Sequence, residues 1–326
     1  MAGATVALRE RARAATNSID ESGFVRIGGI DQWIAIQGSD LGNPAILYLH
    51  GGPGEAQSPF LKEFIPWEKD FTVINWDQRG SGKTFGRNGP STPGMSTPAE
   101  AVGRLTSDAI EVAAYARRRL AKKKLILVGQ SWGTQLGQLV IHERPELFHA
   151  FVGTAMIVSW TQEVAAQQSW ARQEASKAGD QATLDALDLP ASDTRHNMAV
   201  RKYRMSPPDM AYIGAVLGQF TGQPPFPTHG DVTDWLGGYQ FSGLRLTPAL
   251  TSFDARKLGL NIAIPFYVIQ GRDDHIVFAA AAKAFVADIH APKSAFIPIA
   301  GGHFACFTNP NEFVDALRRL VRPLAM

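Results

Sequence analysis

Residues 125–134 read LILVGQSWGT, and they contain the pattern G-x-S-x-G over residues 129–133. Strand-forming apolar residues precede this pattern, and an apolar-periodic segment typical of a helix begins at Gln135. A strand that turns at once into a helix strains the central residue and leaves its side chain on the tip of the turn. The flanking positions must be glycine, because larger side chains would collide with the neighbouring strand and helix. The stretch therefore predicts an exposed nucleophile, Ser131, at a helix N-terminus, where the helix dipole favours developing negative charge.

A serine hydroxyl needs a base to take its proton, and a carboxylate improves that base by fixing its tautomer. Two later predicted strands, 262–269 and 294–299, run into the sequences GRDDH (271–275) and AGGH (300–303). The carboxyl ends of parallel strands meet at one edge of a sheet, so both loops are expected beside Ser131. We predict His303 as the base and Asp274 as the acid. The adjacent Asp273 is the alternative acid, although a turn-forming role suits it better.

Acyl transfer also needs backbone N–H groups that point at the oxygen on which negative charge develops. One such donor is expected from Trp132, the residue after the nucleophile. The other is expected from the sequence HGGPG (50–54), which follows a buried apolar strand and whose glycines allow a close backbone approach. Gly52 is the first choice for this second donor and Gly51 the second choice.

Strand and helix patterns alternate along most of the chain, which predicts an α/β fold with a mostly parallel sheet covered by helices on both faces. Buried strands are expected at 45–50, 71–76, 125–129 and 148–158, and a long helix begins at a capping box formed by Thr97 and Glu100. Buried-strand patterns are missing from about 159 to 251, where helical stretches alternate with prolines. We therefore predict a core made of residues 1–158 and 252–326, interrupted by a mainly helical cap at 159–251.

The combination of these motifs resembles a known family. HGGPG (50–54), DQRGSG (77–82), GQSWG (129–133), GRDD (271–274) and GGH (301–303) together look like the α/β-hydrolase superfamily. Within it they are most similar to the prolyl aminopeptidase (proline iminopeptidase) branch. The resemblance implies an α/β-hydrolase fold, the triad Ser131, Asp274 and His303, and oxyanion donors at Gly52 and Trp132.

The cap departs from that branch, whose members resemble one another in holding the substrate's amino group with cap glutamates. The cap contains only two glutamates, Glu163 and Glu174, and either could equally lie on a solvated helix face. A cap aspartate such as Asp209 or Asp234 is the alternative partner, because a buried ammonium without a carboxylate is costly. Apolar cap residues that could face the substrate or fasten the cap include Trp160, Trp235 and Tyr239.

Composition limits the partners. A formal net charge of +2 over 326 residues gives no broad basic field, so no nucleic-acid partner is expected. No apolar run reaches the roughly 18 residues that a membrane span needs. Residues 1–20 lack the apolar region of a secretory signal and predict a short amphipathic helix, and the lone Cys306 fits a reducing compartment, so a cytoplasmic location is expected. No metal or cofactor is expected, and the sequence leaves the oligomeric state open.

These features predict a serine hydrolase that cleaves an ester or amide bond through an acyl-enzyme. Removal of an N-terminal residue, proline-type, from a short peptide is the first specific hypothesis. A carboxylesterase or lactonase acting on a hydrophobic small molecule is the alternative within the hydrolases. A non-catalytic, ligand-binding member of the fold is the alternative from another class.

Overall fold

The computed structural model describes residues 17–221 and 229–326, and within them one sheet has eight strands in the order β1-β2-β4-β3-β5-β6-β7-β8. β1 and β2 pair antiparallel, as do β2 and β4, and every other neighbouring pair is parallel. The strands are β1 (Ile19–Ile27), β2 (Ile30–Gly38), β3 (Ala45–Leu49), β4 (Thr72–Trp76), β5 (Leu125–Gln130), β6 (Phe148–Thr154), β7 (Phe266–Gly271) and β8 (Ser294–Ile299). The predicted mostly parallel sheet is therefore confirmed.

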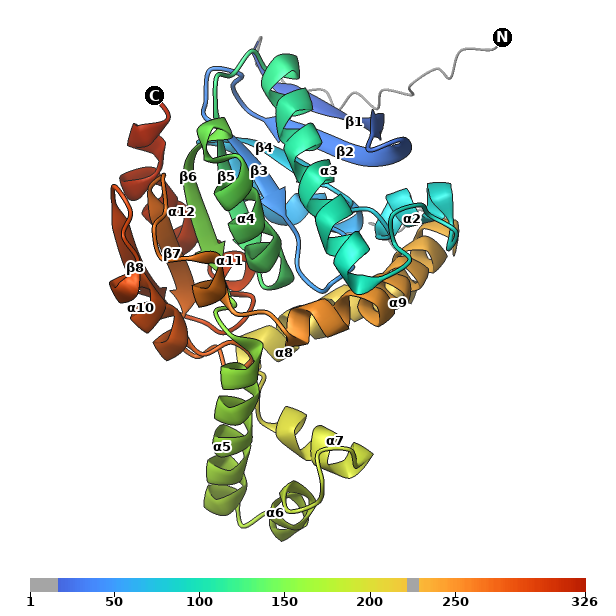
Figure 1. Cartoon of the computed structure of the whole chain (residues 1–326), viewed down its shortest axis with the longest axis vertical. Helices are drawn as coiled ribbons and strands as arrows, with labels where there is room; N and C mark the ends of the chain where they lie inside the picture. Colours follow the sequence, from blue (N-terminus) through green and yellow to red (C-terminus); the bar gives the residue numbers. More distant parts are fainter. Residues whose placement is uncertain (1–16, 222–228) are drawn as a thin grey trace.

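Helices cover both faces of the sheet (Figure 1). Those outside the segment between β6 and β7 are α1 (Ile65–Glu68), α2 (Gly82–Asn88), α3 (Pro98–Arg119), α4 (Trp132–Glu143), α10 (Ala279–Asp288), α11 (Ala305–Thr308) and α12 (Pro310–Leu320). α3 begins where it was predicted, with the Thr97 hydroxyl accepting the Glu100 N–H at 3.2 Å. The Glu100 carboxylate, however, accepts the N–H of Ser96 and not that of Thr97, so the capping box is displaced by one residue.

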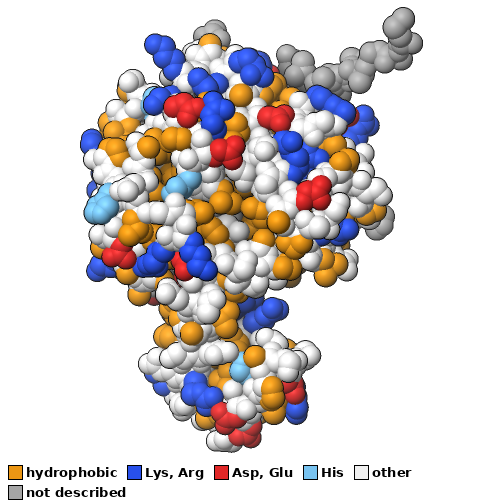
Figure 2. Space-filling model, in the orientation of Figure 1, with side chains coloured by type: hydrophobic (Ala, Val, Ile, Leu, Met, Phe, Trp, Pro, Cys, Tyr) orange, Lys and Arg blue, Asp and Glu red, His pale blue; other side chains and the backbone are white. Residues whose placement is uncertain are grey.

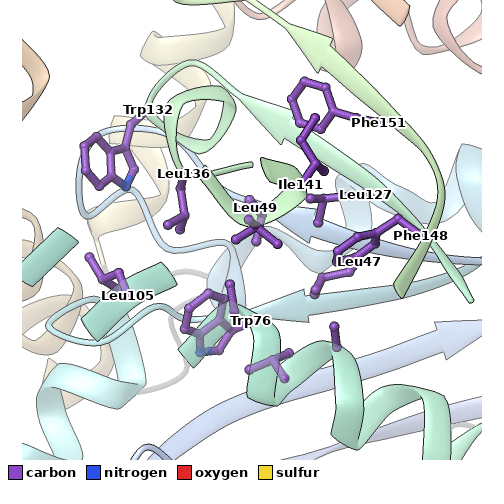
Figure 3. Close-up of a cluster of buried hydrophobic side chains, with 14 of the residues drawn as sticks. Leu47, Leu49, Trp76, Leu105, Leu127, Trp132, Leu136, Ile141, Phe148 and Phe151 are labelled. Atoms are coloured by element: carbon purple, nitrogen blue, oxygen red, sulfur yellow. The ribbon is translucent and has the colours of Figure 1, made fainter. Parts of the chain in front are cut away.

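Alternate residues of the central strands enter two separate cores, which explains why these strands read as continuous apolar runs. Leu47 of β3 and Leu127 of β5 pack toward α3 and α4, whereas Ile46 and Ile126 pack toward α1 and α12. Figure 3 shows part of the first core, where Leu105 of α3 and Leu136 and Ile141 of α4 surround the strand residues. The two cores fix the register of the strands whose carboxyl ends carry the site.

Within the part of the chain that the structure describes, five α-helices lie between β6 and β7, and we call them the cap. They are α5 (Trp160–Ala178), α6 (Gln181–Leu187), α7 (Thr194–Lys202), α8 (Pro207–Gly218) and α9 (His229–Thr251). α5, α6 and α7 form a lobe that protrudes from the body, while α8 and α9 lie along it (Figures 1 and 2). The lobe has a small core of its own, and its tip carries exposed ion pairs such as that of Arg172 with Asp188.

The boundaries differ from the predicted ones in several places. β1 begins at Ile19, inside the segment predicted as an N-terminal helix, and residues 1–16 of that segment lie outside the described residues. β6 ends at Thr154, four residues earlier than the apolar run suggests, because the chain leaves the sheet as buried coil. Among the described residues, no helix combines the length and hydropathy needed to cross a bilayer.

Candidate active site

Ser131 lies between the end of β5 and the start of α4 in a strained backbone conformation, with φ 52° and ψ −119°. Its flanking glycines have no room for a side chain. A Cβ at Gly129 would lie 2.4 Å from the carbonyl oxygen of Gly133, and a Cβ at Gly133 would lie 2.0 Å from that of Leu49 in β3. The strain is held by backbone pairing, since the Ser131 N–H donates to the Thr154 carbonyl at 3.0 Å.

His303 and Asp274 come from the loops after β8 and β7, and they are paired. The Nδ1 atom of His303 lies 3.2 and 3.1 Å from the two carboxylate oxygens of Asp274. Asp274 is itself held by the N–H groups of Ile276 and Val277, which donate to its Oδ1 at 2.9 and 3.0 Å. Asp273 is exposed, so the structure pairs the histidine with Asp274 and leaves Asp273 in the turn.

The charge balance around His303 favours its protonated form. Burial lowers the pKa of His303, but the charge and hydrogen bond of Asp274, together with the charges of Asp209 and Glu55, outweigh burial and raise the pKa above its usual value. Asp209 and Glu55 add smaller contributions in the same direction. A base with a raised pKa accepts a proton more readily, and Asp274 stabilises the imidazolium that results.

The loop 50–54 and the serine turn meet through Gln78. The Gln78 side chain donates to the carbonyl oxygen of His50 at 3.1 Å and accepts from the indole N–H of Trp132 at 3.1 Å. Burial lowers the pKa of His50 to about 4, so its ring is neutral, and its Nε2 accepts the Gln78 N–H at 3.2 Å. Gly52 has φ 110°, which a residue with a side chain rarely adopts, and a Cβ at Gly51 would lie 2.1 Å from Gln130 Oε1. The glycines are therefore needed for this close packing.

Glu55, which follows HGGPG directly, was missed in the sequence analysis. Its backbone N–H donates to the Gly51 carbonyl at 3.1 Å, and its Oε2 would lie 3.2 Å from a Cβ at Gly51. Burial raises the pKa of Glu55 to about 7, and the nearby His303 opposes that rise. Among residues 17–221 and 229–326, no hydrogen-bond donor or cation is paired with its carboxyl group. The only signal in the sequence is an acidic residue inside a glycine-rich, otherwise apolar turn.

The two predicted cap glutamates lie in different environments. Glu163 is 1% exposed, and its Oε2 accepts the Phe278 N–H at 2.7 Å, in the loop that also carries Asp274. Burial raises the pKa of Glu163 to about 8, with Asp274 adding to the rise, so the side chain is mostly protonated at neutral pH. Glu174 forms an ion pair with Lys177 at 2.7 Å on an exposed part of α5. Glu174 therefore already has a charged partner, whereas Glu163 lies beside the Asp274 loop.

Asp209 and Asp234, the two alternative partners for a substrate ammonium, lie in different places. Both oxygens of Asp209 accept hydrogen bonds from the loop that carries His303. Asp234 lies over α2, where a Cβ at Gly86 would come within 1.9 Å of its carboxylate. Asp209 is thus a structural neighbour of the site that the sequence did not identify in this role.

The aromatic residues singled out in the cap fasten it to the core. Trp235 of α9 donates its indole N–H to the Ala56 carbonyl at 2.8 Å, and Tyr239 stacks on Trp235 with ring centroids 5.6 Å apart. Trp160 is half-buried against the larger core. α9 therefore lies directly on the loop that begins with HGGPG, and Tyr239, which is 48% exposed, is the most open of the three side chains.

The fold agrees with the comparisons to known proteins. The chain belongs to the α/β-hydrolase-fold family, whose sequence profile matches residues 44–310. It is 28% identical over 309 residues to the probable aminopeptidase YbaC of Bacillus subtilis, covering 91% of this chain and 94% of that protein. It is 29% identical to a probable proline iminopeptidase of Streptomyces coelicolor over 128 residues, 39% of this chain and 37% of the other.

Among solved structures, the chain is similar to a proline iminopeptidase-related protein of Thermus thermophilus. The TM-score is 0.65 at 21% identity, over 94% of this chain and 99% of that one, which supports the fold alone. The protein is a hydrolase of the α/β family, and its relatives include proteins named as aminopeptidases and proline iminopeptidases.

Proposed function

We propose that the protein is a serine hydrolase that works through an acyl-enzyme. The observation that carries this proposal is the pair formed by His303 and Asp274, on loops at the sheet edge where the strained Ser131 ends β5. The pair orients the imidazole so that its Nε2 is the base, while Nδ1–H is held by the carboxylate. Gly52 and Trp132 are the proposed sources of the two oxyanion N–H donors.

The reaction follows from these groups. His303 Nε2 takes the Ser131 hydroxyl proton as the oxygen attacks the carbonyl carbon, and the imidazolium then gives that proton to the leaving amine or alcohol. The acyl group is left as an ester on Ser131. Water then attacks this ester, while His303 takes a proton from the water and returns it to the serine oxygen. The acid product is released and free Ser131 is regenerated.

We further propose that the substrate is a short peptide from which an N-terminal residue is removed. The names of the relatives support this class, and so does Glu55, a carboxyl group close enough to His303 to affect its pKa. An α-ammonium placed beside Glu55 would ionise that carboxyl and gain a partner, which an uncharged ester substrate does not offer. The Glu55 carboxyl is thus the feature that favours a peptidase over an esterase.

A substrate panel tests both levels of the proposal. Pro-, Ala- and other aminoacyl-arylamides would be compared with short acyl esters and lactones, using the wild type and Ser131→Ala. We expect turnover of aminoacyl-arylamides, and its loss by at least about 10³-fold in Ser131→Ala. Ester turnover without aminoacyl turnover would replace the peptidase by an esterase. Failure of a fluorophosphonate to label Ser131 would instead support a non-catalytic, ligand-binding protein.

A further inference from the structure

The carboxylate of Asp209 joins the cap to the loop that carries His303. Asp209 lies in the first turn of α8 and is 1% exposed. Its Oδ2 accepts the backbone N–H of His303 at 2.8 Å, and its Oδ1 accepts that of Phe304 at 3.0 Å. The Ser206 hydroxyl donates to Oδ2 at 2.8 Å and holds the carboxylate from the cap side. Three donors from two parts of the molecule therefore converge on one buried group.

The His303 loop is shaped to receive this carboxylate. A Cβ at Gly302 would lie 1.9 Å from Asp209 Oδ2 and 2.5 Å from Ser206 Oγ, so only glycine leaves the space. The residue that follows Gly302 is fixed at two points, because Asp209 holds its backbone N–H and Asp274 holds its Nδ1. Neither fixation alone determines where Nε2 points, since the backbone sets the origin of the side chain and Asp274 sets its rotation.

We propose that Asp209 is a positioning residue for His303, so that the seating of cap helix α8 on the core sets the alignment of the catalytic base. This inference rests on the proposed role of His303. It goes beyond that role in making a cap residue, 94 positions away in sequence, part of the machinery that prepares the base. The cap is then coupled to the rate of the chemical step as well as to substrate selection.

Four carboxyl groups interact with His303. Asp274 and Glu55 come from core loops, and Asp209 and Glu163 come from cap helices α8 and α5. The charge of Asp209 raises the pKa of His303, after the larger contribution of Asp274. Removing the Asp209 charge alone should therefore move the protonation of His303 to lower pH, which a purely mechanical support of α8 would not do.

The test compares Asp209→Asn with Asp231→Asn. An amide offers one acceptor oxygen to the three donors and turns an N–H group toward one of them, so the variant loosens the His303 loop. Asp231 forms an ion pair with Lys83 that also joins the cap to the core, but through α9 and α2, away from the catalytic loops. The rate of Ser131 labelling by a fluorophosphonate is measured against pH, because it reports His303 without a known substrate.

We expect Asp209→Asn to slow labelling roughly 10- to 100-fold and to move the acid limb of its pH profile to lower pH, with circular dichroism unchanged. Asp231→Asn is expected to label as the wild type does. Ser206→Ala keeps the charge but frees the carboxylate, so it should slow labelling several-fold without moving the acid limb. The inference would be overturned if Asp209→Asn were labelled at the same rate as Asp231→Asn and with the same pH profile.

Two further outcomes remain decisive. If Asp209→Asn does not fold, Ser206→Ala carries the test, and labelling at the wild-type rate would contradict the positioning role. If the wild type itself is not labelled, the proposed function fails. The imidazole pKa of His303 is then measured by NMR in three proteins: the wild type, Ser206→Ala and Asp209→Asn. A lower pKa in Asp209→Asn supports the contact between Asp209 and His303, and an unchanged pKa refutes it.

Discussion

Carboxyl groups near His303 differ in how many of their oxygens already accept a hydrogen bond. Asp274 and Asp209 accept N–H groups on both oxygens, whereas Glu163 accepts one from Phe278 on Oε2 and its buried Oε1 has no partner among the described residues. Glu55 has no such partner among the described residues, and its pKa is raised to about 7. A carboxyl group that is half-protonated near neutral pH and has no partner is readily ionised by a bound cation. The cation lowers the pKa of the carboxyl group, and the resulting carboxylate binds the cation more tightly.

Glu55→Gln should therefore act mainly on substrates with a free α-ammonium. We expect kcat/KM for an aminoacyl-arylamide to fall about 10- to 100-fold, and the loss for an acyl ester to be much smaller. In the wild type, KM for the aminoacyl substrate should rise as the pH falls below about 7, because Glu55 becomes protonated and must release that proton to bind the ammonium. Steady-state kinetics from mildly acidic to mildly alkaline pH, on both substrates, measure these effects.

The matched control is Glu63→Gln, a half-buried glutamate that lies eight residues further along the same segment. It should leave both substrates and their pH profiles close to the wild type. Equal losses on ester and aminoacyl substrates in Glu55→Gln would contradict an ammonium-binding role for Glu55.

At the residue scale, short sequence motifs predicted the positions at which the backbone adopts an unusual conformation. Ser131 and the glycines beside it are tied to a strand–turn–helix that local sequence encodes, and the later strands pointed to the Asp274 and His303 loops. Asp209 could not be predicted. Its local sequence, with Ser206 as N-cap, is that of an ordinary helix start, and its partners on the His303 loop lie more than 90 residues away.

At the scale of elements, the site depends on how closely strands, turns and helices approach. The turn around Ser131 brings α4 against the end of β3, and the DQRGSG turn is tied to α3 by a buried ion pair. Arg79 donates to Asp108 at 2.6 and 3.1 Å, with both side chains fully buried, and also to the carbonyl oxygens of Gly28 and Pro93. These contacts hold the loops before any substrate arrives.

Gly133→Ala tests the closest approach. The added Cβ would lie 2.0 Å from the Leu49 carbonyl oxygen, a backbone atom that cannot turn aside. We expect α4 to shift away from β3, with a loss of roughly 1–3 kcal/mol in unfolding free energy and a large loss of Ser131 labelling. Urea denaturation and labelling kinetics measure the two effects. Gly103→Ala in α3, where a Cβ meets nothing within 4 Å, is the control and should lose neither.

Asp108→Ala tests the buried ion pair. Removing the carboxylate leaves the Arg79 guanidinium buried without its charged partner, so we expect a loss of about 3 kcal/mol or more in unfolding free energy. Glu21→Ala breaks the exposed pair of Glu21 with Arg119 and should cost less than about 1 kcal/mol. The midpoints of urea unfolding are compared for the two variants. Similar midpoints would show that the buried ion pair contributes little to the free energy of unfolding.

The strands could be predicted from sequence more completely than the cap helices. β3, β4 and β5 are buried on both faces and therefore read as apolar runs. α7 and α9 were not predicted. α9 contains Gly237, Gly238 and Pro248, which intrinsic propensity disfavours in a helix, and it is stabilised by packing on the core loops.

At the scale of the whole molecule, the cap is attached to the core by buried polar contacts at the loops that carry Asp274 and His303. α5 reaches the acid loop through Glu163, with Gln167 donating to the Ile276 carbonyl at 2.7 Å, and α8 reaches the histidine loop through Asp209. The lobe of α5, α6 and α7 extends away from these attachments (Figure 1). Folding of the cap and assembly of the site are therefore expected to be linked.

This link predicts a pH-dependent stability that Glu163→Gln should change. The folded-state pKa of Glu163 is about 8, above the ordinary value of 4.5, so its protonation stabilises the folded protein. That contribution is complete below about pH 4.5 and is lost as the pH rises to about 8. Glutamine does not titrate but keeps an acceptor for the Phe278 N–H. The variant should therefore gain stability relative to the wild type as the pH rises through this window, measured by urea unfolding. A constant difference across the window would contradict the raised pKa.

The seating of α9 limits which residues can be changed beside the HGGPG loop. Backbone meets backbone where this helix crosses the two glycine-rich turns, since a Cβ at Gly54 would lie 2.9 Å from the Tyr239 Cα and one at Gly238 would lie 2.7 Å from the Gly82 nitrogen. Any larger residue at these crossings would push the helix off the HGGPG loop. Variants meant to broaden specificity should leave α9 and α5 in place and vary α6 and α7, which lie in the protruding lobe away from the contacts of the cap with the Asp274 and His303 loops.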